Sequence, residues 1–177
     1  MWCNVGLAMS GAVPSARHCI RLPDLLQIRV NYLPLLKGQY AVNISSYEDL
    51  LKAANAQAEP QRLLFVLTQA ELPDEYTKDQ QERFKARKGG ALTPVMCVDK
   101  LASEQGSFAD FVEESRQTGQ EWDVVFVACL SGKSGLAPSS DDAEEPLKTM
   151  IKSVQVGSIG NFLAFNRNGE LVSLTAS

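Results

Sequence analysis

Two kinds of hydrophobic pattern alternate along residues 42–177. Leu63–Leu67 and Asp123–Leu130 are short, nearly continuous apolar runs, which are typical of strands buried on both faces. Leu92–Val98 predicts a further strand, although Pro94 removes one donor from the ladder. That strand must therefore begin near Pro94 or lie at an edge of the sheet.

Amphipathic stretches with helix-start signals lie between these runs. Ser45-Ser46-Tyr47-Glu48 resembles a capping box before the first of them, and Thr77 and Ser107 can cap two more. A hairpin is predicted near the end, where Asn166-Arg167-Asn168-Gly169 joins two apolar segments, because Asn and Gly tolerate positive φ. The helices are expected over residues 46–57, 78–88, 108–118 and 141–156.

Helices and strands therefore follow one another in the order α-β-α-β-α-β-α-β-β. Such alternation is typical of a parallel sheet covered by helices. We expect an α/β fold with a single-layer, mainly parallel or mixed sheet of about five strands, flanked by helices and ending in a C-terminal β-hairpin.

Residues 1–41 differ from the rest of the chain. They hold four cations and one acid, a net charge of +3, whereas residues 42–177 hold 13 cations and 20 acids, a net charge of −7. They show neither sustained helical nor alternating periodicity and lack the basic start of a signal peptide. We interpret 1–41 as a poorly structured extension and 42–177 as one α/β domain. One interpretation of the extension is a mis-assigned start, with translation beginning at Val42. A targeting segment is the alternative.

Composition excludes several classes of protein. The net charge of −4 leaves no basic footprint for nucleic acid, and no apolar run approaches the roughly 18–20 residues that span a bilayer. Four cysteines are too few for a disulfide scaffold. We expect a cytoplasmic protein that binds neither nucleic acid nor membrane, and its oligomeric state stays open.

Residues 42–177 lack the side chains of several common mechanisms. The single histidine of the chain is His18, so Ser-His-Asp, Cys-His and histidine-containing metal sites are excluded from the domain. No spaced acidic motif resembles a calcium loop. We therefore predict no catalytic residue, no metal site and no cofactor.

A ligand site is the first exception to consider. The loop of Ser131, Gly132, Lys133 and Ser134 follows a predicted strand. It is not a P-loop, because position 127 is Val instead of Gly. A Gly-rich loop with one cation at the carboxyl edge of a parallel sheet nevertheless suits an anion.

Asp99 and Lys100 follow another strand, at the same predicted edge as this loop. We predict that they face a crevice shared with Lys133. The alternatives are a solvated loop and simple strand termination by charge.

Two cysteines form the second candidate. Cys97 and Cys129 lie near the ends of two predicted strands, where they could approach and act as a redox pair. Buried, inert thiols are the alternative, since no sequence neighbour clearly lowers either pKa.

Several segments resemble a known family. They include Asn43–Leu51, Pro60–Val66, Ala70–Pro73, Pro94–Lys100 and Val112–Arg116, and they are similar to a small proteobacterial family often labelled "ribonucleotide reductase subunit alpha". Its members are about as long as residues 42–177. The resemblance implies a shared small fold and a bacterial cytoplasmic setting. It supplies no catalytic residue, because the catalytic subunit of that enzyme needs more cysteines and a large barrel.

Three functions remain. The sequence favours a non-catalytic protein-interaction or regulatory module that binds a protein partner through this acidic domain. A small anion- or nucleotide-type ligand-binding domain is the second. A ribonucleotide-reductase-linked or thiol-redox accessory protein is the third.

Overall fold

A computed structural model describes residues 2–4, 20–21, 44–72, 75–86 and 89–176. Its strands are β1 (Cys3–Asn4), β2 (Ile20–Arg21), β3 (Gln61–Glu71), β4 (Gly89–Leu101), β5 (Val124–Ser131), β6 (Leu163–Asn166) and β7 (Thr175–Ala176). Its helices are α1 (Tyr47–Asn55), α2 (Lys78–Lys85), α3 (Phe108–Arg116) and α4 (Ser140–Gln155), with a 3-10 turn, η2 (Ala102–Glu104).

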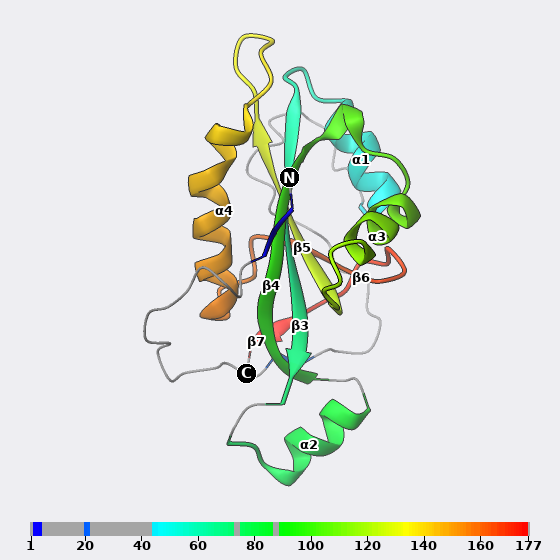
Figure 1. Cartoon of the computed structure of the whole chain (residues 1–177), viewed down its shortest axis with the longest axis vertical. Helices are drawn as coiled ribbons and strands as arrows, with labels where there is room; N and C mark the ends of the chain where they lie inside the picture. Colours follow the sequence, from blue (N-terminus) through cyan, green and yellow to red (C-terminus); the bar gives the residue numbers. More distant parts are fainter. Residues whose placement is uncertain (1, 5–19, 22–43, 73–74, 87–88, 177) are drawn as a thin grey trace.

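The four longer strands form an open sheet with helices on both faces. Figure 1 shows α1 and α3 on one side of the sheet and α4 on the other. Alternate side chains of β3 divide between two cores: Leu63 and Phe65 pack beneath α1 and α3, whereas Leu64 and Val66 pack beneath α4. The prediction that this run is buried on both faces is confirmed.

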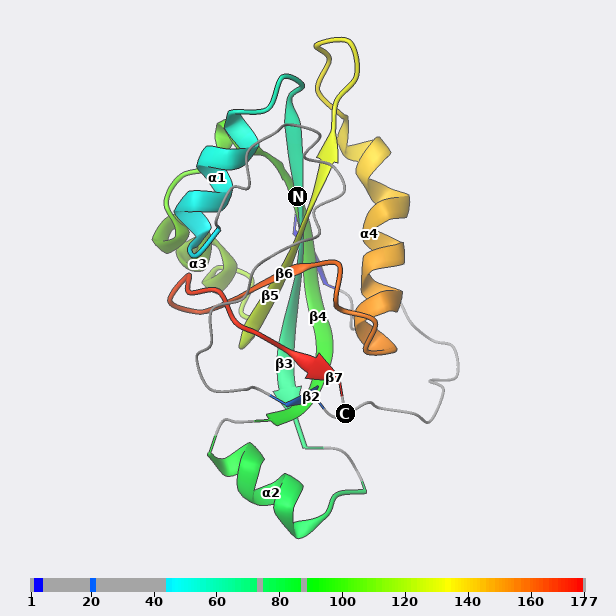
Figure 2. The ribbon, with the colours of Figure 1, turned by 180° about the vertical axis from the view of Figure 1, so that it is seen from behind.

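The predicted parallel sheet is wrong. Every strand pairing in the described part of the chain is antiparallel, and the order across the sheet is β6-β5-β3-β4. The short strands β1 and β2 pair with the far side of β4, and β7 pairs with β2. In Figure 2, β6 and β7 face the viewer.

The connections explain why alternation misled us. The α3 connection does link two strands that run in the same direction, β4 and β5, but β3 lies between them. The α2 connection crosses no strand, because α2 lies beyond the end of the sheet and leaves β3 and β4 as a long hairpin (Figure 1). No residue of α2 is buried, so this polar helix has no face with which to cover a sheet.

The C-terminal hairpin does not form as predicted. The chain does reverse at the predicted turn, where Gly169 has a φ of 77° and its amide donates to Asn166 O at 3.0 Å. Beyond the turn the chain makes two isolated bridges, from Leu171 to Phe165 and from Glu170 to Ser46, in place of a second strand. The next strand is β7, which pairs with β2.

As the sequence predicts, Pro94 lies in a stretch of strand at an edge of the sheet. The stretch of β4 around it pairs with β3 and, among the described residues, with no strand on the other side. The register shifts there, with Leu67 opposite Met96 and Thr68 opposite Pro94, so that Val95 forms a bulge.

Parts of residues 1–41 lie against the sheet. β1 pairs with β4 at Cys97 and Met96, and β2 pairs with β4 at Gly90 and Gly89. The rest of the extension, which we expected to be poorly structured, lies outside the described residues. The suggested start at Val42 lies there too.

Candidate functional site

The predicted ligand residues do come to one end of the sheet. β4 and β5 run in the same direction on either side of β3, so both end where β3 begins. The register places Arg62 opposite Leu101 on one side and Leu130 on the other, with Gln61 opposite Ser131. The backbone therefore brings the two predicted segments to a common edge.

Asp99 is held in a structural ion pair. Its carboxylate contacts the Arg62 guanidinium, and both side chains are nearly buried, at 12% exposed for Arg62 and 11% for Asp99. Ser140 Oγ donates to Asp99 Oδ2 at 2.9 Å, and Arg62 Nε donates to Pro138 O at 2.7 Å. This cluster fastens the start of α4 to β3 and β4.

Lys100 points to the opposite face of the sheet. Neighbouring side chains on a strand alternate, so Lys100 lies beneath α3 when Asp99 lies beneath α4. Its ammonium forms an ion pair with Glu114 of α3 and lies 5.8 Å from the ring centroid of Trp2. The structure thus does not bring Asp99 and Lys100 to one crevice.

The loop after β5 is a tight turn. Lys133 and Leu136 exchange backbone hydrogen bonds at 3.1 and 3.0 Å. The two central residues have positive φ, 54° at Ser134 and 77° at Gly135, as a type I′ turn requires. Lys133 lies at the base of the turn and is exposed. The pKa of the Asp142 carboxyl is lowered mainly by hydrogen bonds from the Ser139 hydroxyl and amide, and the charge of Lys133 lowers it further.

The amides of this loop bind groups of the chain itself. Gly132 N donates to Pro60 O at 2.8 Å, and Gly135 N donates to the Glu59 carboxylate at 2.7 Å. Ser131 Oγ accepts from Gln61 Nε2 at 3.0 Å. A Cβ at position 132 would lie 2.2 Å from the Leu136 carbonyl oxygen, so glycine is needed for this close approach. The loop therefore does bind an anion, but this anion is the Glu59 carboxylate of the chain itself.

The two cysteines of the domain do not meet. Cys97 is opposite Val66 of β3 and packs in the core beneath α4. Cys129 is opposite Leu63, on the other side of β3, and packs against the core beneath α1 and α3. They lie on different faces with a strand between them, so this fold cannot join them by a disulfide.

Cys129 is expected to react slowly with electrophiles. Burial raises the pKa of its thiol to about 11, so at neutral pH it holds about 100-fold less thiolate than an ordinary cysteine. Iodoacetamide labelling followed by mass spectrometry should give a rate that keeps rising above pH 10, while the chain unfolded in guanidinium reacts normally. Labelling of the folded chain that saturates below pH 9 would contradict this assignment.

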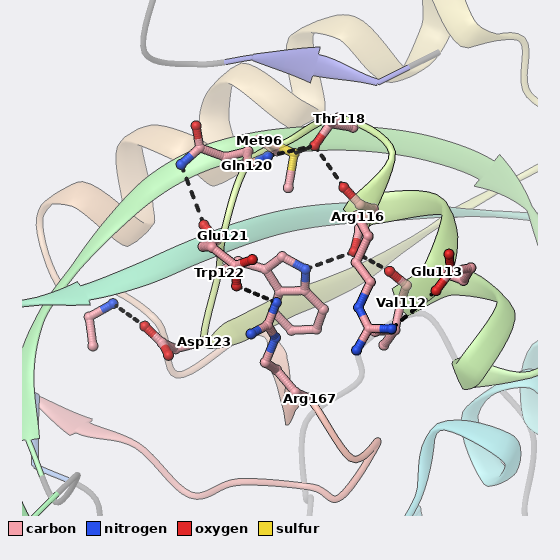
Figure 3. Close-up of polar contacts among 12 residues, drawn as sticks. Met96, Val112, Glu113, Arg116, Thr118, Gln120, Glu121, Trp122, Asp123 and Arg167 are labelled. Carbon is pink, nitrogen blue, oxygen red and sulfur yellow. Dashed lines mark hydrogen bonds and ion pairs between the residues drawn. The ribbon is translucent and has the colours of Figure 1, made fainter.

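A hydrogen-bonded cluster joins α3 to β5 (Figure 3). The indole Nε1 of Trp122 donates to Ser115 Oγ at 2.9 Å, and this hydroxyl donates to Val112 O at 2.7 Å. The guanidinium of Arg167 lies 5.4 Å from the indole ring centroid and pairs with Glu121 at 2.7 Å. Trp122 and Ser115 are both buried, and their polar atoms are hydrogen-bonded within the chain. We therefore assign the cluster a structural role.

The side of β4 that faces away from β3 offers a different kind of site. Two short segments distant in sequence, β1 and β2, add to it antiparallel, one at each end. In Figure 1, β1 lies in front of β4, and β2 is labelled in the view from behind in Figure 2. An edge strand presents unpaired N–H and C=O groups, which can bind an extended segment.

One side chain of the added segment is anchored in an aromatic slot, which we define as Lys100, Phe111 and Glu114. The Trp2 ring lies 5.4 Å from that of Phe111 at an interplanar angle of 44°. The Lys100 ammonium, paired with Glu114, lies over the Trp2 ring. Backbone pairing and a side-chain slot therefore meet at the same point of β4.

Sequence reasoning missed this slot. The sequence predicts Lys100 in a crevice shared with Lys133, and it gives no reason to link Lys100 with Phe111. Trp2 lies in a stretch without periodicity, so no pattern indicated which strand it would join.

No metal cluster and no membrane helix are present in the part of the chain that the structure describes. There, no three His, Cys, Asp or Glu side chains gather in an arrangement suited to a metal ion. None of the described helices is long and apolar enough to cross a bilayer. Compared with known proteins, the chain matches no family model, no curated protein and no solved structure.

Proposed function

We propose that this protein is a non-catalytic interaction module that binds a partner protein along the edge of β4 that faces away from β3. One observation carries the proposal: two separate segments of the chain already add to this edge as antiparallel strands. In strand addition the main-chain groups of an edge strand bind the added segment, and neighbouring side-chain sites then provide selectivity.

The middle of the edge supports the same function. Residues 91–95 lie between the two added strands and, among the described residues, pair only with β3. Pro94 and the bulge at Val95 interrupt this stretch, which is how edge strands limit indiscriminate pairing. An edge with such interruptions favours a partner of matching register over general aggregation.

The charges near the edge do not prevent a partner strand from binding there. Lys100 and Arg62, the cations at the end of β3 and β4, are each neutralised by a carboxylate of the chain. The resemblance of 42–177 to a bacterial family supports a cytoplasmic setting for the partner as well.

Site-specific photo-cross-linking tests the proposal. Val95→p-benzoylphenylalanine places the reactive group in the middle of the edge, and Lys148→p-benzoylphenylalanine places it on exposed α4 as a matched control. After irradiation of cells that make the full chain, we expect an adduct with another protein from position 95 alone. Mass spectrometry of the joined peptide identifies the partner and the contacting segment.

Two outcomes would count against the proposal. One is the absence of any adduct from a position-95 variant whose circular dichroism shows it to be folded. The other is the same adduct from position 148, which would indicate contact without a preferred edge.

A further inference from the structure

We infer that the partner strand carries an aromatic side chain that takes the place of Trp2 in the aromatic slot of Lys100, Phe111 and Glu114. This inference rests on the proposed function, since it names the class of segment that the β4 edge accepts. Trp2 then acts as an intramolecular substitute for the partner.

The apolar wall of the slot belongs to a larger aromatic cluster. Phe111 is 2% exposed, and its ring centroid lies 4.7 Å from that of Phe65 and 6.2 Å from that of Tyr47. Trp2 continues this cluster beyond the edge of the sheet. An aromatic ring is favoured here over an aliphatic chain of similar size because tilted rings at these distances attract one another.

The polar wall of the slot also selects an aromatic ring. Lys100 Nζ lies 5.8 Å from the Trp2 centroid, within the range at which a cation is attracted to a ring. Its ion pair with Glu114 of α3 holds the ammonium over the slot. Aliphatic side chains gain nothing from this cation.

Register fixes where the aromatic residue must stand in the partner. Cys3 is the Cα partner of Cys97, and β1 runs antiparallel to β4. The ring therefore belongs to the residue immediately before the one opposite Cys97. The partner is expected to be extended, antiparallel to β4, and aromatic at that position.

Attachment within one chain makes Trp2 a strong competitor. A tethered segment acts at an effective concentration on the order of millimolar, so a free peptide must compete with it. Removing the indole by Trp2→Ala should therefore expose the slot while the rest of the chain is retained.

A peptide titration tests the inference on the full chain. The probe is the acetylated hexapeptide MWSNVG, which reproduces residues 1–6 with serine for cysteine, and the control peptide is MASNVG. Amide NMR spectra of the 15N-labelled Trp2→Ala variant should show saturable shifts at Met96 and Val98 with MWSNVG. We expect at least about tenfold weaker binding of MASNVG, and of MWSNVG to the chain that retains Trp2.

Variants at Lys100 separate the cation from general packing. In the Trp2→Ala chain, Lys100→Met should weaken MWSNVG several-fold and Lys100→Arg should restore it. Lys148→Met, on α4, is the control and should leave binding unchanged.

Equal binding of the two peptides would overturn the aromatic slot while leaving strand addition in place. Absence of shifts in β4 with either peptide, in a folded Trp2→Ala chain, would also overturn the inference. The cross-link at position 95 judges the proposed function separately, because it depends on no added peptide and no chosen side chain.

Discussion

Trp122→Ala is expected to lower the free energy of unfolding by about 3–5 kcal/mol. The indole is 1% exposed, and its ring packs edge-on against Phe108 and Phe111 at centroid distances of 6.5 and 6.4 Å. Truncation leaves a cavity between α3 and the start of β5, which the sheet beneath cannot fill. Urea unfolding followed by circular dichroism gives the loss as a lower midpoint.

Trp122→Phe is the matched control for this loss. It keeps most of the apolar ring and removes the Nε1 donor to Ser115, whose hydroxyl still donates to Val112 O. The expected loss is about 1–2 kcal/mol, from one hydrogen bond and the smaller ring. Equal losses for the two substitutions would show that packing of the ring does not dominate at this position.

Arg62→Met is expected to lower the free energy of unfolding by about 2–4 kcal/mol. The substitution removes the cation from Asp99, a carboxylate that is 11% exposed and that still accepts from Ser140. It also removes the donor to Pro138 O that holds the chain before α4. Partial burial of the pair makes the lost partner costly, because water cannot fully replace it.

A double-mutant cycle with Asp99→Leu isolates the pair. The double variant should recover part of the loss, giving a coupling energy of at least about 1 kcal/mol. The exposed pair of Arg116 and Glu113, at 63% and 64%, is the control and should give a coupling below about 0.5 kcal/mol. Similar couplings at the two sites would mean that Arg62 and Asp99 are a surface pair in energetic terms.

Local signals predicted the elements well because they act over a few residues. Thr77 and Ser107 cap α2 and α3 as expected, each through a capping box, and Gly119, with a φ of 74°, lies in the turn after α3. The N-cap of α1 is Ser46, one residue after the predicted Ser45. Strand order depends on which strand a connection passes over, and neither composition nor periodicity contains that information.

The sequence predicted the sheet edge at which the proposed ligand residues lie, but not the directions of their side chains. Chain direction alone brings the ends of β4 and β5 together, and this expectation survived the change from a parallel to an antiparallel sheet. Alternation along β4 could have warned that Asp99 and Lys100 face opposite ways. Nothing in the loop sequence indicated that Glu59, which precedes β3, would accept the hydrogen bond from the Gly135 amide.

The central position of β3 has a consequence for the order in which the fold assembles. β3 reaches β4 through residues 72–88 alone, whereas its pairing with β5 must enclose both β4 and α3. Closing the shorter loop costs less chain entropy, so the β3–β4 hairpin is the part of the sheet that can form first. During synthesis the hairpin emerges with one edge of β3 unpaired, and β5 is the strand that closes it.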